Sequence, residues 1–238
     1  MTSLSSRTAV VTGASRGIGA GIASALAAQG ARVVMLARNE EKLKELSARL
    51  NGSIPVACDL SDPKSVEKAA KQITRELRSA PDILVNNAGI FRVALVEETT
   101  AESFIEMVST NLVGPFLLIR SFLGDMKKRK TGHIVTIGSV ADRTIFTGNA
   151  AYSAAKFGLR AVHEVLRAEL RGTGVRATLI SPAATNTDMW SSVTITDPAG
   201  KPHSTRPMLD PDDVVRAVLF ALAQPEAVNI DELRLSHS

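Results

Sequence analysis

The sequence has few of the residues that mark secreted and membrane proteins. Cys58 is the only cysteine in 238 residues, so no disulfide can form within the chain. A lone thiol suits a reducing compartment, and we expect a cytoplasmic protein in which Cys58 is buried. Residues 1–7 are short and polar and lack the layout of a signal peptide. Because no run of about 18 apolar residues occurs, no membrane span is expected.

The chain also lacks a strong excess of charge and any spacing typical of a metal site. The formal net charge is only +4, and acidic residues are interspersed with the basic ones, so no nucleic-acid partner is expected. One basic run, residues 127–130, is interpreted as a helix end, where cations suit the helix dipole. The four histidines, His133, His163, His203 and His237, have no metal-ligand spacing, so no metal site is predicted.

Short apolar runs alternate with helical segments along the whole chain. The apolar runs cover residues 8–12, 32–37, 54–57, 83–86, 133–138, 176–181 and 230–235. The helical segments cover residues 17–29, 40–50, 63–78, 99–129, 150–171 and 211–223. Continuous apolar runs are typical of parallel strands that helices cover on both faces. We therefore predict one doubly wound α/β domain over residues 1–238, with a parallel seven-stranded sheet and helices on both faces.

Two segments depart from this rhythm. The long helical segment 99–129 contains Gly114-Pro115 and is expected to bend or break there. Residues 191–208 are loop-like, and a connection of this length in a compact domain is often a lid or a binding segment. We predict a substrate loop at about residues 188–209, with an ordinary surface loop as the alternative.

A glycine-rich turn, T-G-A-S-R-G-I-G at residues 12–19, joins the first predicted strand to the first predicted helix. Glycines at 13, 17 and 19 permit a tight turn and let backbone N–H groups approach a pyrophosphate. The N-terminus of the helix adds a partial positive charge. Glycine-rich turns often serve packing alone, but the strand-turn-helix context favours dinucleotide binding.

The end of the second predicted strand indicates which dinucleotide is bound. An acidic residue there would bind a ribose 2′-hydroxyl group and repel a 2′-phosphate. The position holds Ala37, Arg38 follows it, and Arg16 projects from the nearby glycine turn. Two guanidinium groups suit a phosphate dianion, so NADP(H) is favoured over NAD(H). The alternative, that Arg38 is only a solvated cation, leaves the missing acid unexplained.

Tyr152 is the only tyrosine in the chain, and Lys156 follows it by four residues. On a helix, residues at this spacing share a face. An ammonium group ~4 Å from the phenol is worth ~4 kcal/mol at an effective dielectric near 20. That energy would lower the pKa of Tyr152 from about 10 toward ~7, a useful value for a general acid or base. Alone, such a pair is usually a surface contact, and a strand-end serine such as Ser139 usually forms a turn.

Taken together, these motifs resemble the short-chain dehydrogenase/reductase (SDR) family over nearly the whole chain. The shared features are the G-x3-G-x-G spacing, the N-N-A-G run that starts at Asn86, and the Y-x3-K motif. The resemblance implies an NADP(H)-preferring Rossmann-like oxidoreductase with a catalytic tetrad of Asn111, Ser139, Tyr152 and Lys156. Ser139 would hold the substrate oxygen and Tyr152 would exchange a proton with it. Lys156 would also bind the nicotinamide ribose, and Asn111 would hold a water of the proton relay.

The resemblance also assigns the cofactor site, position by position. The implied contacts are Gly13, Ser15, Arg16, Gly17, Ile18, Gly19, Arg38, Asp59, Leu60, Asn87, Ala88, Gly89, Tyr152, Lys156, Pro182, Thr185 and Thr187. For Asp59, a bond to the adenine amino group and a cap on the following turn are both open. Ala183 stands where the family usually has glycine, and its methyl group could narrow the nicotinamide pocket or only restrict the backbone.

The predicted substrate pocket is mostly apolar. Ile90 and six predicted substrate residues form its walls, namely Phe91, Ala141, Ile145, Phe146, Met189 and Trp190. We therefore expect a ketone or aldehyde with a hydrophobic portion. A 3-oxoacyl thioester and a cyclic or steroid-like ketone both remain open, as does whether Trp190 lines the pocket or anchors the loop.

The predicted assembly and two rival functions complete the interpretation. Segments 99–129 and 150–171 resemble the helices that pair in family dimers and tetramers, so a homo-oligomer is predicted. A non-catalytic NADP(H) sensor or scaffold would be expected to lose Tyr152 or Lys156. Relatives that eliminate halide from halohydrins carry arginine in place of the lysine and a spoiled nucleotide turn. The presence of both Tyr152 and Lys156 argues against the sensor, and Lys156 with the intact glycine turn argues against halide elimination.

Overall fold

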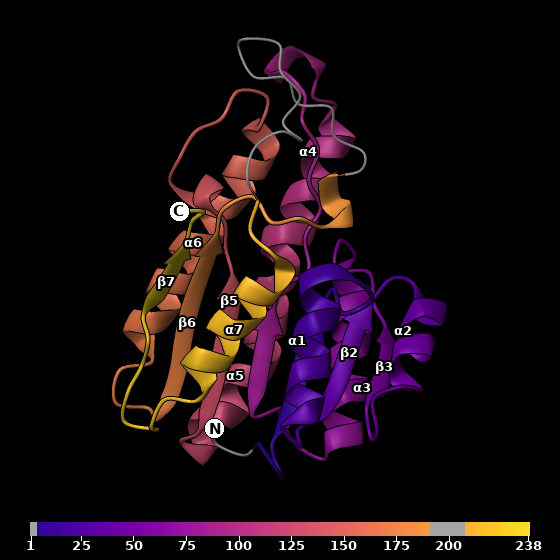
Figure 1. The fold of residues 1–238 in the computed structure, drawn as a ribbon, viewed down its shortest axis with the longest axis vertical. Helices are drawn as coiled ribbons and strands as arrows, with labels where there is room; N and C mark the ends of the chain where they lie inside the picture. The colour runs from indigo at the N-terminus through magenta and orange to yellow at the C-terminus, as the bar shows by residue number, and fades with distance from the viewer. Residues whose placement is uncertain (1–3, 191–207) are drawn as a thin grey trace.

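Seven parallel strands form one sheet in a computed structural model, which describes residues 4–190 and 208–238. The strands are β1 (Thr8–Thr12), β2 (Arg32–Ala37), β3 (Ile54–Ala57), β4 (Ile83–Asn86), β5 (Gly132–Ile137), β6 (Val175–Pro182) and β7 (Glu232–Leu235). They lie in the order β3-β2-β1-β4-β5-β6-β7, and Figure 1 shows β2 and β3 toward one side of the sheet and β6 and β7 toward the other. The predicted doubly wound α/β fold is therefore confirmed.

Sheet pairing explains where the strand boundaries differ from the prediction. Strands β1 to β4 begin and end at the predicted residues. The β5 strand is shifted one residue toward the N-terminus because Gly132 pairs with Val175. The β6 strand extends to Pro182 because that residue pairs with Leu235, and β7 begins only at Glu232, where its pairing with Leu179 starts.

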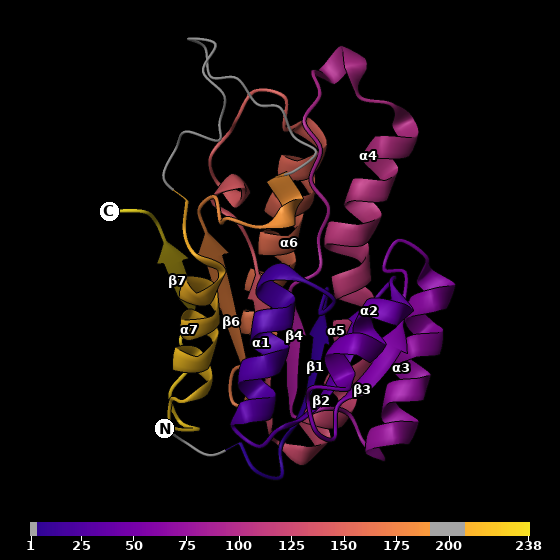
Figure 2. The same ribbon diagram turned by 45° about the vertical axis from the view of Figure 1, so that its right-hand side comes forward.

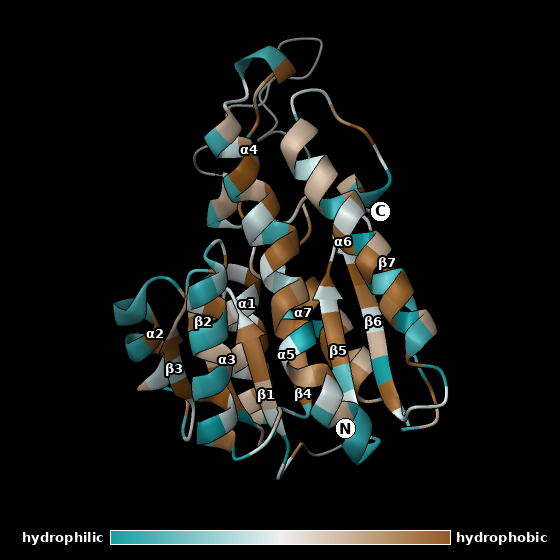
Figure 3. Cartoon of the chain, turned by 180° about the vertical axis from the view of Figure 1, so that it is seen from behind, coloured by the Kyte–Doolittle hydropathy of each residue, from teal (hydrophilic) through white to brown (hydrophobic). Residues whose placement is uncertain are grey.

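Helices cover both faces of the sheet. On one face lie α1 (Gly17–Ala28), α2 (Glu40–Ser47) and α7 (Pro211–Leu222), and on the other α3 (Pro63–Leu77), α5 (Gly114–Arg129) and α6 (Ala150–Glu169). Two hydrophobic cores result, with Ile22 and Val214 in one and Leu118 and Phe122 in the other. Figure 3 shows hydrophobic strands beneath helices whose surfaces carry hydrophilic stretches. Because both sheet faces are covered, the strands are apolar throughout.

In the part of the chain that the structure describes, three single-turn helices and α4 (Ala101–Val108) stand in the connections. The single turns are η1 (Val96–Glu98), η3 (Val140–Asp142) and η4 (Asp188–Trp190). Figure 2 shows the strand arrows pointing toward the end of the molecule where α4 and the beginning of α6 rise above the sheet. The chain after β7 ends at the same edge, whereas β1 begins at the opposite one.

The predicted break at Gly114-Pro115 takes a different form. The helix runs from Ala101 to Arg129 through one wide π-helical turn, η2 (Ser109–Val113), and Pro115 lies just after it. Proline lacks the N–H that would bond four residues back, so a local change of helical winding accommodates it without a break. Gly114 lets the helix approach the loop after β3, because a Cβ there would lie 2.7 Å from the Leu60 carbonyl oxygen.

By length and composition alone, this 29-residue helix is one that could cross a membrane, a property it shares with core helices. Its α5 half supplies Leu118, Phe122 and Met126 to the hydrophobic core that also includes Val66 and Ile73 of α3. Packing in this core therefore accounts for the apolar side chains of the α5 half.

Two histidines are buried as core residues. His133 Nε2 lies 2.8 Å from Thr178 Oγ1, and His163 Nδ1 lies 3.1 Å from Thr136 Oγ1. Burial lowers the pKa of His133 to about 3 and that of His163 to about 4, so both rings are neutral at physiological pH. Within residues 4–190 and 208–238, no group of three His, Cys, Asp or Glu side chains could hold a metal. His203 and most of the predicted substrate loop lie outside these residues.

Candidate active site

A cleft of about 980 Å³ opens at the carboxyl edge of the sheet. The sheet order places β1 beside β4 at its centre, so the chain leaves in opposite directions from these two strands. Ligands of doubly wound folds bind at this kind of topological switch point. All of the predicted cofactor and substrate residues line the cleft, as do Ser139, Tyr152 and Lys156. Asn111 is the exception among the predicted residues, because it is buried behind the wall.

The glycine turn is shaped by contacts that exclude side chains. Gly13 has φ +67°, and a Cβ on it would lie 2.9 Å from the Ala88 Cα. A Cβ on Gly19 would lie 2.3 Å from the Gly13 carbonyl oxygen. Arg16, the N-cap residue of α1, makes no side-chain capping bond to the first helical N–H groups. The first turn of α1 can therefore offer its N–H groups to a pyrophosphate.

The N-N-A-G run ties the two central strands together. Asn87 Nδ2 donates to the Thr12 carbonyl oxygen over 2.9 Å. Thr12 Oγ1 accepts hydrogen bonds from the backbone N–H groups of Asn87 and Ala88, both at 2.9 Å. The sequence interpretation did not single out Thr12, although a polar residue at the end of an apolar strand was a visible signal. These bonds fix the spacing of β1 and β4 at the floor of the cleft.

The two arginines predicted to bind a 2′-phosphate are weakly held by other groups. Arg38 Nη1 lies 3.7 Å from Glu106 Oε1, and Arg16 Nη1 lies 3.9 Å from Asp188 Oδ2. Both side chains are 60% exposed, and surface ion pairs of this kind contribute about 0–1 kcal/mol. A phosphate dianion could displace the carboxylates, and Ala37 brings no acid to oppose it. The residues present therefore fit a dinucleotide that carries a 2′-phosphate.

The residues after β3 form the wall near Arg38. Asp59 Oδ1 accepts from the Ser61 backbone N–H at 2.9 Å and from the Ser61 hydroxyl at 2.7 Å. Asp59 thus caps the turn, which was one of its two predicted roles, and it also lines the cleft. Cys58 beside it is buried, and burial raises the pKa of its thiol to about 11. A thiol with this pKa is inert at neutral pH.

Three of the four predicted catalytic residues meet where β5 ends. Ser139 caps η3, its Oγ accepting from the Ala141 N–H at 3.1 Å, and it lines the cleft together with Tyr152. Lys156 Nζ donates to the Ile137 carbonyl oxygen at 3.0 Å and lies 5.7 Å from the centre of the Tyr152 ring. The end of β5 and the beginning of α6 thus bring a serine, a tyrosine and a lysine into one site.

The electrostatics of the site differ from the prediction. Burial raises the pKa of Tyr152 to about 12, although the Ser139 side chain opposes the shift. Burial also lowers the pKa of Lys156 to about 8, opposed by the charge of Asp142. The prediction that Lys156 brings the phenol toward ~7 is therefore wrong for the cofactor-free structure. The physical reason is that desolvation disfavours the phenolate, while the ammonium group is bonded to the Ile137 carbonyl.

Asn111 lies in the π-helical turn and contacts the loop after β4. Its Oδ1 accepts from the Ile90 N–H, and its Nδ2 donates to the Ile90 carbonyl oxygen, both at 2.8 Å. A Cβ on Gly89 would lie 3.2 Å from Asn111 Oδ1. The side chain therefore holds the segment that carries Phe91, and its part in a water relay stays a prediction.

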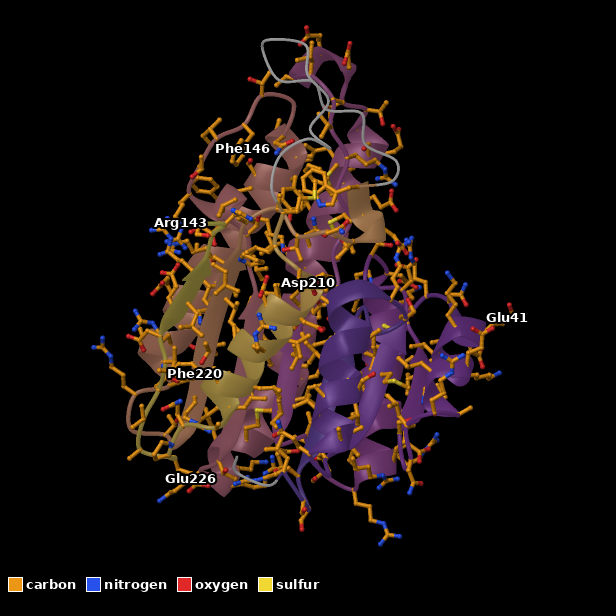
Figure 4. The ribbon with its side chains drawn as sticks, in the orientation of Figure 1. Glu41, Arg143, Phe146, Asp210, Phe220 and Glu226 are labelled. Carbon is orange, nitrogen blue, oxygen red and sulfur yellow. The ribbon has the colours of Figure 1, made fainter. Side chains whose placement is uncertain are left out.

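Aromatic side chains narrow one end of the cleft. The Phe91 ring meets the Tyr152 ring edge-on at 4.7 Å between centres and the Trp190 ring at 5.2 Å. Ile145 and Phe146 stand more exposed on the loop before α6, where Figure 4 labels Phe146 near the upper end of the molecule. This end of the cleft is the apolar part that sequence reasoning assigned to the substrate.

The segment after β6 lies against the glycine turn. Ala183 donates its N–H to the Leu235 carbonyl oxygen at 2.9 Å and has no positive φ, so a methyl group there causes no backbone strain. Trp190 Nε1 donates to the Thr185 carbonyl oxygen at 2.9 Å, so Trp190 both lines the cleft and anchors the segment. A Cβ on Gly17 would lie 3.4 Å from Thr187 Cγ2, which places Thr187 beside the turn.

Sequence reasoning missed Asp142, a fully buried acid directly behind the site. Its Oδ2 accepts from the Ser181 hydroxyl at 2.7 Å, and its Oδ1 accepts from Arg143 Nε at 2.7 Å. Its pattern carried no signal, since an Asp-Arg pair after a strand is normally read as a solvated turn.

Comparisons with known proteins agree with this geometry. The family model described as short chain dehydrogenase matches residues 7–197. A glycine betaine reductase of Emericella nidulans is 38% identical over 237 residues, which are 97% of this chain but only 18% of that protein. An uncharacterized oxidoreductase of Staphylococcus saprophyticus is 35% identical over 237 residues, 98% of each chain. The structure of a metagenomic short-chain oxidoreductase in complex with NADP is 32% identical, with a TM-score of 0.83 and full coverage of both chains.

The family match covers most of the chain, and the relative from Staphylococcus saprophyticus matches it end to end. Strands β1 to β6, the glycine turn and the Ser-Tyr-Lys site lie within the residues that the family model matches. The chain therefore belongs to the short-chain dehydrogenase family of oxidoreductases.

Proposed function

We propose that this enzyme uses NADPH to reduce a ketone or an aldehyde to an alcohol, with Tyr152 as the general acid. The observation that carries the proposal is the meeting of Ser139, Tyr152 and Lys156 on the wall of the cleft that also contains the glycine turn. One part of this cleft fits a dinucleotide, and the other offers a proton donor beside apolar walls. That combination suits hydride transfer coupled to proton transfer.

The cofactor assignment rests on residues at both ends of the cleft. The glycine turn and the first turn of α1 would hold the pyrophosphate. Arg16 and Arg38 would bind the 2′-phosphate, and Lys156 would bind the nicotinamide ribose. Thr185 and Thr187, on the segment that lies against the glycine turn, would hold the nicotinamide end. The NADP complex of the similar metagenomic oxidoreductase supports this choice.

Proton transfer is assigned to residues of this chain. When bound, the cofactor would supply the hydride, and its oxidised form would add a positive charge to the site. Ser139 donates a hydrogen bond to the substrate oxygen and holds it beside the phenol. Because burial keeps the Tyr152 phenol protonated at neutral pH, the proton is in place before the reaction begins. Lys156, Ser139 and the new positive charge then stabilise the phenolate that remains.

The substrate class follows from the apolar end of the cleft. Phe91 and Trp190 pack edge-to-face there with 5.2 Å between ring centres, and Met189 and Ala141 also line the wall. These surfaces favour a carbonyl compound with a hydrophobic portion, either a 3-oxoacyl thioester or a cyclic ketone. A cytoplasmic location is consistent with the lone buried thiol of Cys58.

A homo-oligomer is part of the proposal, because apolar side chains are exposed on the helices that rise at the carboxyl edge. Phe104 and Ile105 of α4 are 39% and 62% exposed, and Phe157 and Val165 of α6 are 40% and 59% exposed. Clustered apolar exposure of this kind is typical of protein interfaces. Pairing of α4 and α6 with a second copy would cover it.

The oligomer is tested by light scattering coupled to size-exclusion chromatography. We expect the mass of a dimer or a tetramer, and the double variant Ile105→Lys, Val165→Lys should shift the mass toward the monomer. The control Val228→Lys introduces a charge at an exposed apolar residue of the segment between α7 and β7. A monomeric mass for the unmodified protein would contradict the proposal.

Replacement of Tyr152 by phenylalanine tests the general acid. Tyr152→Phe should lower kcat at least ~100-fold, because general acids contribute 10²–10⁴-fold, while NADPH affinity stays nearly normal. Turnover is followed at the absorbance band of reduced nicotinamide with a panel of ketones, and affinity is followed by NADPH fluorescence. The matched control is Ser153→Ala, which removes a hydroxyl from the neighbouring residue of α6. Near-normal turnover of Tyr152→Phe would refute the mechanism.

The unmodified enzyme also tests the rival function in the same assay. Tight NADPH binding without oxidation by any carbonyl compound in the panel would favour a sensor or scaffold over a reductase.

Replacement of Arg38 by aspartate tests the cofactor assignment. Arg38→Asp removes a charge-assisted hydrogen bond worth about 1.5–3 kcal/mol and adds a repelling charge, so the NADPH-to-NADH ratio of kcat/KM should fall at least ~10-fold. The matched control is Arg49→Asp, an equal change of charge at an exposed residue outside the cleft. An unchanged ratio for Arg38→Asp would remove Arg38 from the site.

A further inference from the structure

A buried ionic cluster lies directly behind the catalytic residues. It consists of Asp142, Arg143, Arg160, Ser181 and Glu232, which we call the Asp142 cluster. These residues come from η3, the loop after it, α6, the end of β6 and the beginning of β7. The Asp142 side chain is 0% exposed, whereas Arg143 and Glu232 are each 23% exposed. Figure 4 shows Arg143 next to the carboxyl end of β7.

Every charge in the cluster has a partner of opposite sign. Asp142 Oδ1 accepts from Arg143 Nε at 2.7 Å and lies 3.9 Å from Arg160 Nη1. Glu232 accepts from Arg160 Nη1 and Nη2 at 3.2 and 3.3 Å, and it also pairs with Arg143. Asp142 Oδ2 accepts from the Ser181 hydroxyl at 2.7 Å. The Asp142 carboxylate is therefore fixed by hydrogen bonds and ion pairs within the protein rather than by water.

The cluster touches the backbone that holds Ser139 and Lys156. The Asp142 N–H donates to the Ser139 carbonyl oxygen at 3.0 Å. A Cβ on Gly138 would lie 3.0 Å from Asp142 Oδ2, so the carboxylate lies against the segment between Ile137 and Ser139. The Ile137 carbonyl oxygen is the group that accepts from Lys156 Nζ. Asp142 therefore contacts the strand-end segment whose Ile137 carbonyl oxygen accepts the hydrogen bond from Lys156.

The cluster also meets α6 one turn beyond Lys156. Tyr152, Lys156 and Arg160 follow one another at intervals of four residues and share a helix face. Arg160 joins this face to Asp142 and Glu232. The cluster thus braces both partners of the Lys156–Ile137 bond, the strand end and the helix.

Lys156 is a buried cation, and Asp142 is the charge that acts on it. Burial lowers the pKa of Lys156 to about 8, and the Asp142 carboxylate raises it. Among the described residues, the other titratable groups along this side of α6 are Tyr152, Arg160, His163 and Glu164. His163 is neutral, and Glu164 lies 3.7 Å from Arg160, with which it forms an ion pair. Arg143 pairs with both Asp142 and Glu232.

We propose that Asp142 is a positioning residue, whose buried carboxylate keeps Lys156 protonated and holds the Ile137–Ser139 segment in place for catalysis. This inference rests on the proposed reductase function. The proposal predicts how the loss of each neighbouring charge shifts the pH at which Lys156 loses its proton. Loss of the Asp142 charge lets Lys156 release its proton at lower pH. Loss of the Arg143 charge leaves Asp142 less compensated, so Lys156 keeps its proton to higher pH.

The lone tyrosine provides a readout that does not need turnover. Protein labelled with [13Cζ]-tyrosine has one resonance from the chain, because Tyr152 is the only tyrosine. In the cofactor-free enzyme that resonance should show a small step near pH 8, when Lys156 loses its proton beside the ring. We expect Asp142→Asn to move the step down by about one pH unit and Arg143→Gln to move it up. Glu232→Gln should move it down by less, since its charge is farther away.

A second readout is the pH profile of kcat/KM for carbonyl reduction. The reactive form carries protons on both Tyr152 and Lys156, so the basic limb reports the first of the two to be lost. This limb should move down in Asp142→Asn and up in Arg143→Gln. A merely structural role would lower the rate in both variants without opposite displacements of the limb.

The variants distinguish the possible outcomes. Steps that move in the same direction in Asp142→Asn and Arg143→Gln, or that do not move, overturn the proposal. If Asp142→Asn does not fold, opposite shifts in Arg143→Gln and Glu232→Gln support it, and shifts of one sign refute it. If the unmodified enzyme shows the step but reduces no carbonyl compound, the proposed function fails while the effect of Asp142 on Lys156 still stands.

Discussion

The hydrogen bond from the Lys156 ammonium group to the Ile137 carbonyl oxygen is the interaction on which the site depends. It spans 3.0 Å and joins α6 to the end of β5. Because Tyr152 lies one turn earlier on the same helix, this bond places the phenol beside Ser139, the second residue after Ile137. Burying an ammonium group without a hydrogen-bond partner costs free energy. The position of α6 that lets Lys156 reach the Ile137 carbonyl oxygen is therefore favoured.

Burial drives both titratable groups of the site toward their neutral forms. It raises the pKa of Tyr152 to about 12 and lowers that of Lys156 to about 8. The phenol of Tyr152 is therefore protonated and can act as an acid. The charge of Asp142 favours the protonated form of Lys156 beside it. Formation of the phenolate then requires further positive charge. This requirement couples proton release to the state of the cofactor and disfavours ionisation of the phenol in the empty enzyme.

Much of the fold and of the candidate site could be predicted from the sequence, for one topological reason. Parallel strands deliver their carboxyl ends to one edge, so residues such as Gly13, Asn87 and Ser139, which follow strand ends, had to meet there. Helical spacing added Lys156 to Tyr152. These inferences depend on local pattern and on chain direction, both of which are visible in a sequence.

What could not be predicted depends on contacts between distant segments. The pKa of Tyr152 is set by how deeply the phenol is buried, which no spacing reveals. Asp142 is buried in a cluster with Ser181 and Glu232, which are 39 and 90 residues away in the chain, so its sequence neighbours do not reveal this environment. The π-helical turn that carries Asn111 lies just before Pro115, where Gly114 packs closely against the loop after β3. In each case tertiary packing decides the property.

The central claim, that Tyr152 is a buried acid whose proton release depends on positive charge in the cleft, is tested most directly by ultraviolet titration of the phenol with saturating NADP+. The chain has one tyrosine and one tryptophan, so the phenolate band belongs to Tyr152 alone. The account predicts a midpoint well below ~10, the value of a free tyrosine, with NADP+ bound, and no ionisation below that pH in its absence. A midpoint at or above ~10 in the NADP+ complex would contradict it.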